Sequence, residues 1–242
     1  MPRDYFPNEQ TAVPKASPVK RIAAFYARQY EVIKGMRRYL RLAVLAFLLT
    51  TAAGTIFFLL KPDLALHWMT DYRTRYLQER PRLTSQSGTF FYIAINNLRA
   101  TFSACLAGLL PLFLPAVVGL VFNTTLLCLI FVAGLIQHEP VITRFLTLIL
   151  PHGIIEIPTM IFVSGFSLHL SSHMTKRLFR KKPRLTDSTG RLFEFISQEN
   201  LLDRQDALAE IFLMFAAVIL PLVVIAALIE SFITPIIYRI FA

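Results

Sequence analysis

The run ATFSACLAGLLPLFLPAVVGLVFNTTLLCLIFVAGLIQ, at residues 100–137, contains 38 residues without a charged side chain. One straight helix of this length would be about 57 Å long, whereas the hydrocarbon core of a bilayer is about 30 Å thick. Pro111 and Pro115 lie near the first third of the run. Each proline removes a backbone donor and disfavours helical backbone in the residue before it. The run therefore predicts two transmembrane helices, over residues 90–112 and 116–136, that meet near these prolines.

Three other segments are apolar enough to cross a membrane. Residues 42–60 carry no charge, and residues 211–238 open with 19 uncharged residues. Residues 145–170 are apolar apart from three ionisable side chains. Because about 20 helical residues span the core, the sequence predicts an all-α polytopic membrane protein with about five transmembrane helices. Pro221 and Pro235 are expected to bend the last of them.

The composition of the whole chain excludes a soluble globule. Of its 242 residues, 55% are hydrophobic and 17% are charged, whereas soluble domains carry about 25% charged residues. The mean hydropathy is +0.55. The net charge of +10 excludes an acidic disordered tail. The two cysteines, Cys105 and Cys128, lie in apolar runs and are too few for a disulfide scaffold.

The surplus of basic residues predicts the orientation. Residues 1–41 hold nine Lys and Arg, and residues 171–210 hold eight. Cytoplasmic loops carry an excess of these residues, so both segments are expected inside. Both segments lie on the same side only if an even number of crossings separates them. Dividing residues 100–137 into two helices gives this even number. The N-terminus is then cytoplasmic and the C-terminus outside, and we expect no nucleic-acid partner because the rule already explains the basic tracts.

The segments between the crossings have distinct characters. Residues 1–18 contain four prolines and predict a disordered cytoplasmic tail. Residues 19–41 predict an amphipathic helix that either lies on anionic lipid or docks a cytoplasmic partner. Residues 61–89 are too polar to span and are expected outside, whereas residues 171–210 form a basic cytoplasmic segment.

Polar side chains within the apolar segments predict the functional site, because embedded charges are costly. His152 and Glu156 are four residues apart and share a helix face. With Arg99 as a partner for Glu156 or Glu230, they form a packing clamp; alternatively, they line a proton or transport path. Glu230 is also interpretable as an interfacial carboxylate in contact with water. The predicted intramembrane polar cluster comprises Asn96, Asn97, Arg99, Asn123, His152, Glu156 and Glu230.

Other chemistry is not expected. Two helical ligands are too few for a metal, and no HExxH or Cys-His spacing occurs, so we predict no metal and no cofactor. No nucleophile elbow, P-loop or dinucleotide fingerprint occurs either, so we do not expect an enzyme. Small residues and one proline are interpreted as sites of close helix packing or turns, which also favours self-association: Gly108, Gly119, Gly134, Gly153, Gly165 and Pro158.

Four stretches resemble one family. Residues 149–158, ILPHGIIEIP, are similar to the signature of the stage II sporulation protein M family, which comprises bacterial and archaeal integral membrane proteins. Residues 95–100, 108–123 and 226–235 resemble further family segments in the same order. The chain has Asn123-Thr124 where the family often has Asn-Gly, which argues against a tight-turn role there.

The resemblance implies a function. The sporulation member works with two partner proteins in a cell-wall remodelling complex that drives engulfment, and its partners carry the peptidoglycan hydrolysis. We therefore expect a non-enzymatic scaffold in the cell membrane that contacts the lipid bilayer and recruits cell-wall hydrolases or other membrane partners. The alternative is a transporter or permease subunit whose polar path uses His152, Glu156, Arg99 and Glu230. Formation of a homo-oligomer is compatible with both.

Overall fold

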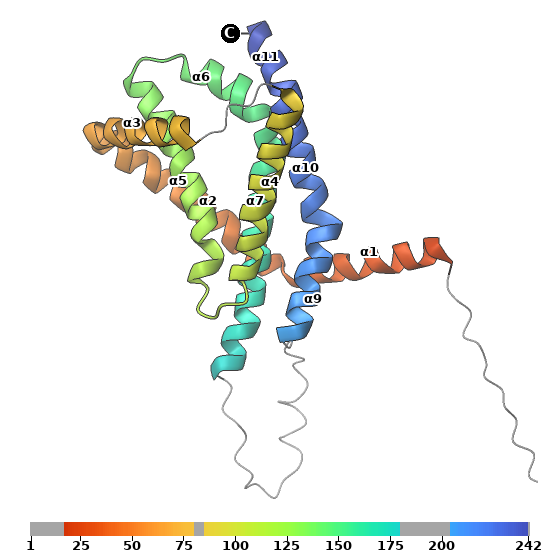
Figure 1. Ribbon diagram of the computed structural model, residues 1–242. Helices are drawn as coiled ribbons and strands as arrows, with labels where there is room; N and C mark the ends of the chain where they lie inside the picture. Colours follow the sequence, from red (N-terminus) through yellow and green to blue (C-terminus); the bar gives the residue numbers. More distant parts are fainter. Residues whose placement is uncertain (1–16, 80–84, 180–203, 242) are drawn as a thin grey trace, which may run out of the picture.

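The computed structural model describes residues 17–79, 85–179 and 204–241, and within these ranges the regular structure is entirely helical. Four helical segments in the described part are long and apolar enough to cross a membrane. The protein is therefore an all-α membrane protein, with its long helices running alongside one another (Figure 1). The four segments are Arg37–Leu60, Leu114–Ile136, Val141–Phe179 and Ala207–Phe241.

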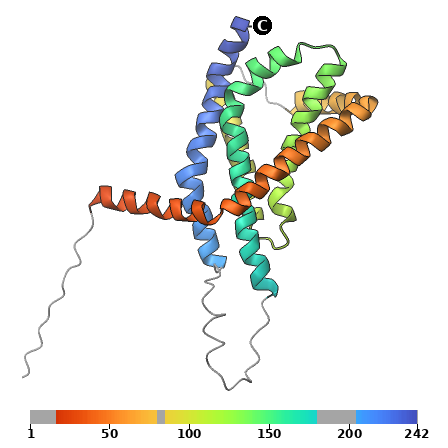
Figure 2. The same cartoon turned by 180° about the vertical axis from the view of Figure 1, so that it is seen from behind.

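Two helices project sideways from the bundle, and the long helix between them in the sequence connects one to the other. Helix α1 (Pro18–Gly35) projects away from the other helices, and α3 (Pro62–Glu79) lies across the far end of α2 (Arg37–Leu60) (Figures 1 and 2). The non-helical backbone of Met36 separates α1 from α2. The predicted amphipathic helix therefore ends within residues 19–41, and most of the predicted tail at 1–18 lies outside the described residues.

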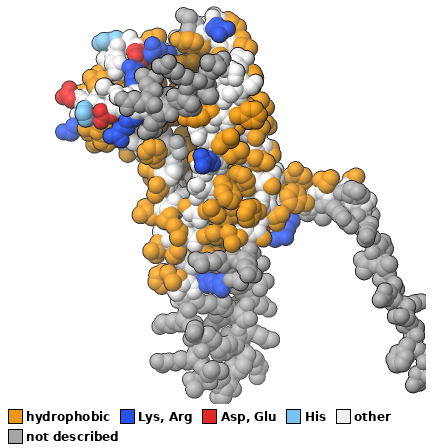
Figure 3. Space-filling model, viewed as in Figure 1, with side chains coloured by type: hydrophobic (Ala, Val, Ile, Leu, Met, Phe, Trp, Pro, Cys, Tyr) orange, Lys and Arg blue, Asp and Glu red, His pale blue; other side chains and the backbone are white. Residues whose placement is uncertain are grey.

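The surface of the bundle has an apolar middle. On the face in Figure 3, hydrophobic side chains cover the sides, whereas charged side chains gather at the end where α3 lies. The described helices expose many large apolar side chains, among them Leu48, Leu49 and Phe122. Lipid-facing surfaces have this character, because the bilayer interior is the solvent for these side chains.

The long uncharged run is broken into two helices. Helix α4 (Gln86–Ala107) begins at Ser85, whose side chain accepts a hydrogen bond from the Gly88 amide at 3.0 Å, and α5 (Leu114–Ile136) follows a turn at residues 108–113. At 22 residues α4 is about 33 Å long, although it is not one of the four segments that are apolar enough to cross a membrane. It packs against α7 (Leu150–Phe179).

Hydroxyl groups of α7 hold the turn between α4 and α5. Ser167 donates to the Ala104 carbonyl at 2.7 Å. Ser171 donates to the Leu110 carbonyl at 2.7 Å and accepts from the Phe113 amide at 3.1 Å. Leu112 and Phe113 have φ values of 79° and 62°, a region that bulky residues rarely adopt. The hydroxyls therefore satisfy backbone groups that this strained turn leaves free of the helices.

In the part of the chain that the structure describes, three wide π turns lie within the last two long helical segments, and each ends two residues before a proline. Proline lacks an amide donor and its ring crowds the carbonyl four residues earlier. A wider turn relieves this crowding without ending the helix, so the last segment stays helical through both of its prolines. The pairs are η1 (Phe145–Ile149) with Pro151, η2 (Phe215–Ile219) with Pro221, and η3 (Ile229–Ile233) with Pro235.

The π turns lie within two composite helices. Helix α6 (Val141–Arg144), η1 and α7 form the first, and α7 also continues through Pro158. The second comprises α9 (Arg204–Met214), η2, α10 (Leu220–Leu228), η3 and α11 (Thr234–Phe241). Helix α7 extends to residue 179 and α9 begins at residue 204, so both enter the predicted basic segment 171–210, whose middle lies outside the described residues.

The predicted glycine positions differ in what surrounds them. A Cβ at Gly108 would lie 2.8 Å from the Ser167 carbonyl oxygen, and one at Gly165 would lie 3.1 Å from Leu40 Cα. These two glycines therefore allow helix backbones to approach closely. At Gly119 a Cβ would meet nothing within 4 Å, and at Gly153 it would meet only ordinary side-chain contacts of its own helix. Close packing between helices is therefore the wrong interpretation for Gly119 and Gly153.

At the end of the bundle near α3, one carboxylate links α3 to α6 through two ion pairs. Glu139, in the turn after α5, forms ion pairs with Arg73 of α3, at 3.4 Å, and with Arg144 of α6. Nearby, Gly134 allows the side chain of Val141 to approach, because a Cβ would lie 2.9 Å from it. These contacts fix α3 against the ends of α5 and α6.

Candidate functional site

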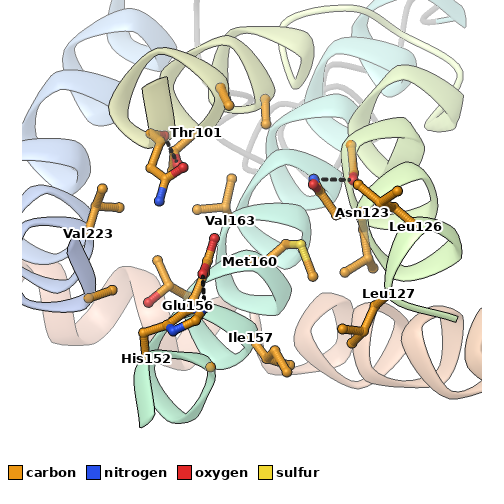
Figure 4. A pocket seen from close by; sticks show the side chains of 18 of the residues that line it. Thr101, Asn123, Leu126, Leu127, His152, Glu156, Ile157, Met160, Val163 and Val223 are labelled. Carbon is orange, nitrogen blue, oxygen red and sulfur yellow. Dashed lines mark hydrogen bonds and ion pairs between the residues drawn. The ribbon is translucent and has the colours of Figure 1, made fainter. Parts of the chain in front are cut away.

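A cavity of about 440 Å³ lies among α4, α5, α7 and the last composite helix. Its walls are mainly apolar, and Ile157, Met160 and Val163 of α7 and Val223 of α10 surround it (Figure 4). Polar side chains from all four helices also face it. A mainly apolar cavity with a few embedded polar side chains is the default place to look for a ligand or a path.

His152 and Glu156 form the polar centre on α7. Their spacing of four residues places them on one helix face, with His152 Nε2 3.7 Å from Glu156 Oε2 (Figure 4). The His152 side chain is 14% exposed, and its Nδ1 atom is buried without a hydrogen-bond partner. Glu156 points into the cavity beside it (Figure 4). The His152 side chain is therefore enclosed by its neighbours, whereas the Glu156 side chain lines the cavity and is 43% exposed.

Glu230 completes the centre from the opposite helix. It lies in the π turn η3 and also lines the cavity. One ligand atom from each of His152, Glu156 and Glu230 lies within 4.8 Å of the others. Within the described residues, no other group of three His, Cys, Asp or Glu side chains is this close. Glu230 is half-buried, so it joins the cavity centre while the interpretation of a carboxylate in contact with water stays open.

Amide and hydroxyl groups line the rest of the cavity. Asn97 and Thr101 of α4 face it, and the Thr101 hydroxyl donates to the Asn97 carbonyl. Asn123 of α5 donates through Nδ2 to the Gly119 carbonyl at 2.8 Å. Its amide is thereby bonded within its own helix. These groups add polar surface to the cavity without adding charge.

Some predicted residues lie elsewhere. Arg99 and Asn96 are exposed on α4 and do not line the cavity. Within the described residues Arg99 forms no ion pair, so its predicted pairing with Glu156 or Glu230 is wrong. Gly108 follows α4 and packs against Ser167 of α7, outside the cavity. Pro158 is exposed on α7, next to the cavity-lining Ile157.

Sequence reasoning missed several cavity residues. Thr101 lies four residues after Asn97, and Thr159 lies three residues after Glu156, so helical spacing alone places each on the face of a predicted polar residue. Tyr72 of α3 also lines the cavity. No local pattern signals Tyr72, because it belongs to a helix that lies across the bundle end.

Comparison with known proteins is consistent with this architecture. The family model described as stage II sporulation protein M matches residues 43–235. This range includes all of the cavity-lining residues. No curated protein and no solved structure matches the chain.

Proposed function

The chain belongs to the stage II sporulation protein M family, and we propose that it is a non-enzymatic scaffold that holds cell-wall remodelling partners at the membrane during engulfment. The family match and the membrane-spanning helices support a sporulation-related membrane protein. The observation that carries the scaffold role is the pair of helices that leave the bundle at different levels, α1 and α3 (Figures 1 and 2).

The proposed topology has five crossings with a cytoplasmic N-terminus. The basic residues of α1 and α2 and those at the end of α7 support this orientation, because α1 and the α7 end lie toward the same end of the bundle (Figure 1). An ion pair at 3.2 Å between Arg28 of α1 and Glu210 of α9 joins the two basic segments. In this topology α3 is extracytoplasmic.

Helix α3 is the proposed docking site for a peptidoglycan hydrolase. Its inner face packs through Ala65 and Met69 against apolar side chains of α5. Its outer face exposes polar side chains, including Thr74 and Arg75. Because Glu139 and Arg73 fix the helix to the bundle, the outer face is presented in a defined orientation.

Site-specific crosslinking tests this proposal. A photo-crosslinking amino acid at Thr74 is expected to form an adduct with a peptidoglycan hydrolase in sporulating cells. The matched control is the same amino acid at Leu49, which is exposed on the apolar surface of α2 and should yield no hydrolase adduct. Equal yields at the two positions, or no hydrolase adduct at Thr74, would contradict docking at α3.

A second function, transport, is supported by the cavity itself. Two carboxylates and a histidine from facing helices lie together in an apolar bundle, and such groups often mark ion or proton paths. Arg99 is not part of this path, because it is exposed away from the cavity.

A flux measurement tests the transport role. In proteoliposomes, Glu156→Gln is expected to reduce proton or ion flux at least tenfold, because a neutral amide cannot carry the charge at the centre of the path. The control Asp71→Asn removes an exposed carboxylate of α3 and should leave flux unchanged. Flux that is the same in wild type and Glu156→Gln would reject transport through this cavity.

A further inference from the structure

The side chains at the cavity centre match a set of metal ligands. Each of His152, Glu156 and Glu230 offers one ligand atom, and the three atoms lie within 4.8 Å of one another. Ligands about 2.1 Å from a tetrahedral metal ion are roughly 3.4 Å apart. Side-chain rotations that move the ligand atoms by about 1 Å or less would therefore bring all three atoms to bonding distance of one ion.

The backbone holds these ligands on two helices. His152 and Glu156 are one turn apart on α7, directly after η1, while Glu230 lies in η3 of the facing helix. Helix α4 packs against both α7 and η3. π turns are frequent at functional sites because they redirect side chains within a helix. The ligand set is therefore built on rigid elements instead of on a loop.

Charge balance favours a cation at this position. When ionised, Glu156 and Glu230 together carry a charge of −2 in a cavity with mainly apolar walls. Arg99 lies outside the cavity. A divalent ion bound by Glu156 and Glu230 would neutralise this charge, with His152 as a neutral ligand.

From this geometry we propose that His152, Glu156 and Glu230 bind one divalent transition-metal ion, Zn²⁺ or Mn²⁺, inside the membrane. One imidazole and two carboxylates suit these ions, whereas Mg²⁺ and Ca²⁺ prefer oxygen ligands and copper(I) prefers sulfur. The cavity of about 440 Å³ leaves room for water molecules to complete the coordination. This site goes beyond the proposed scaffold role and does not depend on it.

The chain contains a matched control pair. His67 and Asp71 on α3 have the same four-residue spacing, and their Nε2 and Oδ2 atoms are 3.8 Å apart. Both side chains are more than half exposed, and no third ligand joins them among the described residues. If a helical His–carboxylate pair were sufficient to bind the ion, this pair would bind it too.

Metal titration of the full chain tests the site. The protein is purified in mild detergent, stripped with a chelator, and titrated separately with Zn²⁺, Mn²⁺ and Mg²⁺ by calorimetry and by elemental analysis after desalting. We expect one Zn²⁺ or Mn²⁺ per chain and at least tenfold weaker binding of Mg²⁺. Glu230→Gln and His152→Ala are each expected to weaken binding at least tenfold, whereas the double variant His67→Ala, Asp71→Asn binds as the wild type does.

Three results would overturn the site: less than one tightly bound ion per chain, equal binding by Glu230→Gln, or loss of binding in the His67/Asp71 double variant. Size-exclusion profiles show whether each variant is folded. If Glu230→Gln does not fold, the thermal unfolding midpoint of the wild type is measured with and without each metal ion. An ion that binds the folded chain specifically raises this midpoint. A shift with Zn²⁺ or Mn²⁺ but not with Mg²⁺ supports the site, and no shift rejects it. Hydrolase crosslinking at Thr74 tests the scaffold role separately.

Discussion

Replacing Gly108 with alanine is expected to destabilise the protein by about 1–3 kcal/mol, the usual cost of overpacking a well-packed contact. The added Cβ would lie 2.8 Å from the Ser167 carbonyl oxygen and 2.9 Å from Ser167 Cα. Both are backbone atoms and cannot rotate away, so α4 and α7 must separate. The midpoint of thermal unfolding, measured by size-exclusion chromatography of heated samples in detergent, should fall by several degrees.

Gly119→Ala is the matched control for this substitution. Gly119 is also in a long helix, but a Cβ there would meet nothing within 4 Å. Alanine is a better helix former than glycine by about 1 kcal/mol, so Gly119→Ala should leave the unfolding midpoint unchanged or raise it. Equal losses of stability in the two variants would mean that the contact between Gly108 and Ser167 is not the cause.

Ser171→Ala should destabilise the turn between the two central helices by about 1–3 kcal/mol. The buried hydroxyl donates to the Leu110 carbonyl and accepts from the Phe113 amide. Alanine leaves both backbone groups without these bonds, in a turn where Leu112 and Phe113 have positive φ. We expect a lower unfolding midpoint together with faster proteolysis at residues 108–113, which limited digestion and mass spectrometry would detect.

Ser103→Ala serves as the reference for Ser171→Ala. Ser103 is exposed on α4, so removal of its hydroxyl should change neither the unfolding midpoint nor the cleavage pattern. If Ser171→Ala resembled Ser103→Ala in both measurements, the hydroxyl groups of α7 would not be what holds the turn.

The division of the uncharged run illustrates what sequence can predict. The spacing of Pro111 and Pro115 predicts a break, and the structure has a turn there because Pro111 cannot continue α4 and Pro115 lies in the first turn of α5. The break begins at Gly108, four residues before the predicted end of the first helix. The difference arises because hydroxyl groups of α7, which are distant in the sequence, stabilise a longer turn.

The candidate site was only partly predictable, for a physical reason. The spacing of His152 and Glu156 places them together, since helical geometry is local. Glu230 is 74 residues from Glu156 (230 − 156), and its contact depends on the register of two helices, which local patterns do not encode. The rule that embedded charges need partners predicts Arg99 at the site, but the rotation of α4 leaves its side chain exposed outside the cavity.

The π turns have a consequence for the rotational phase of the last helix. Each residue of an α-helix advances the chain by about 100°, so the extra residue of a wide turn rotates everything beyond it by a similar angle. Helix α11 contacts η1 in this rotated setting. Deletion of one residue within Ile229–Ile233 would leave the helix almost as long and as hydrophobic as before. Helix α11 would nevertheless present a different face to η1. The alignment of these two helices therefore depends on phase, which hydrophobicity alone does not record.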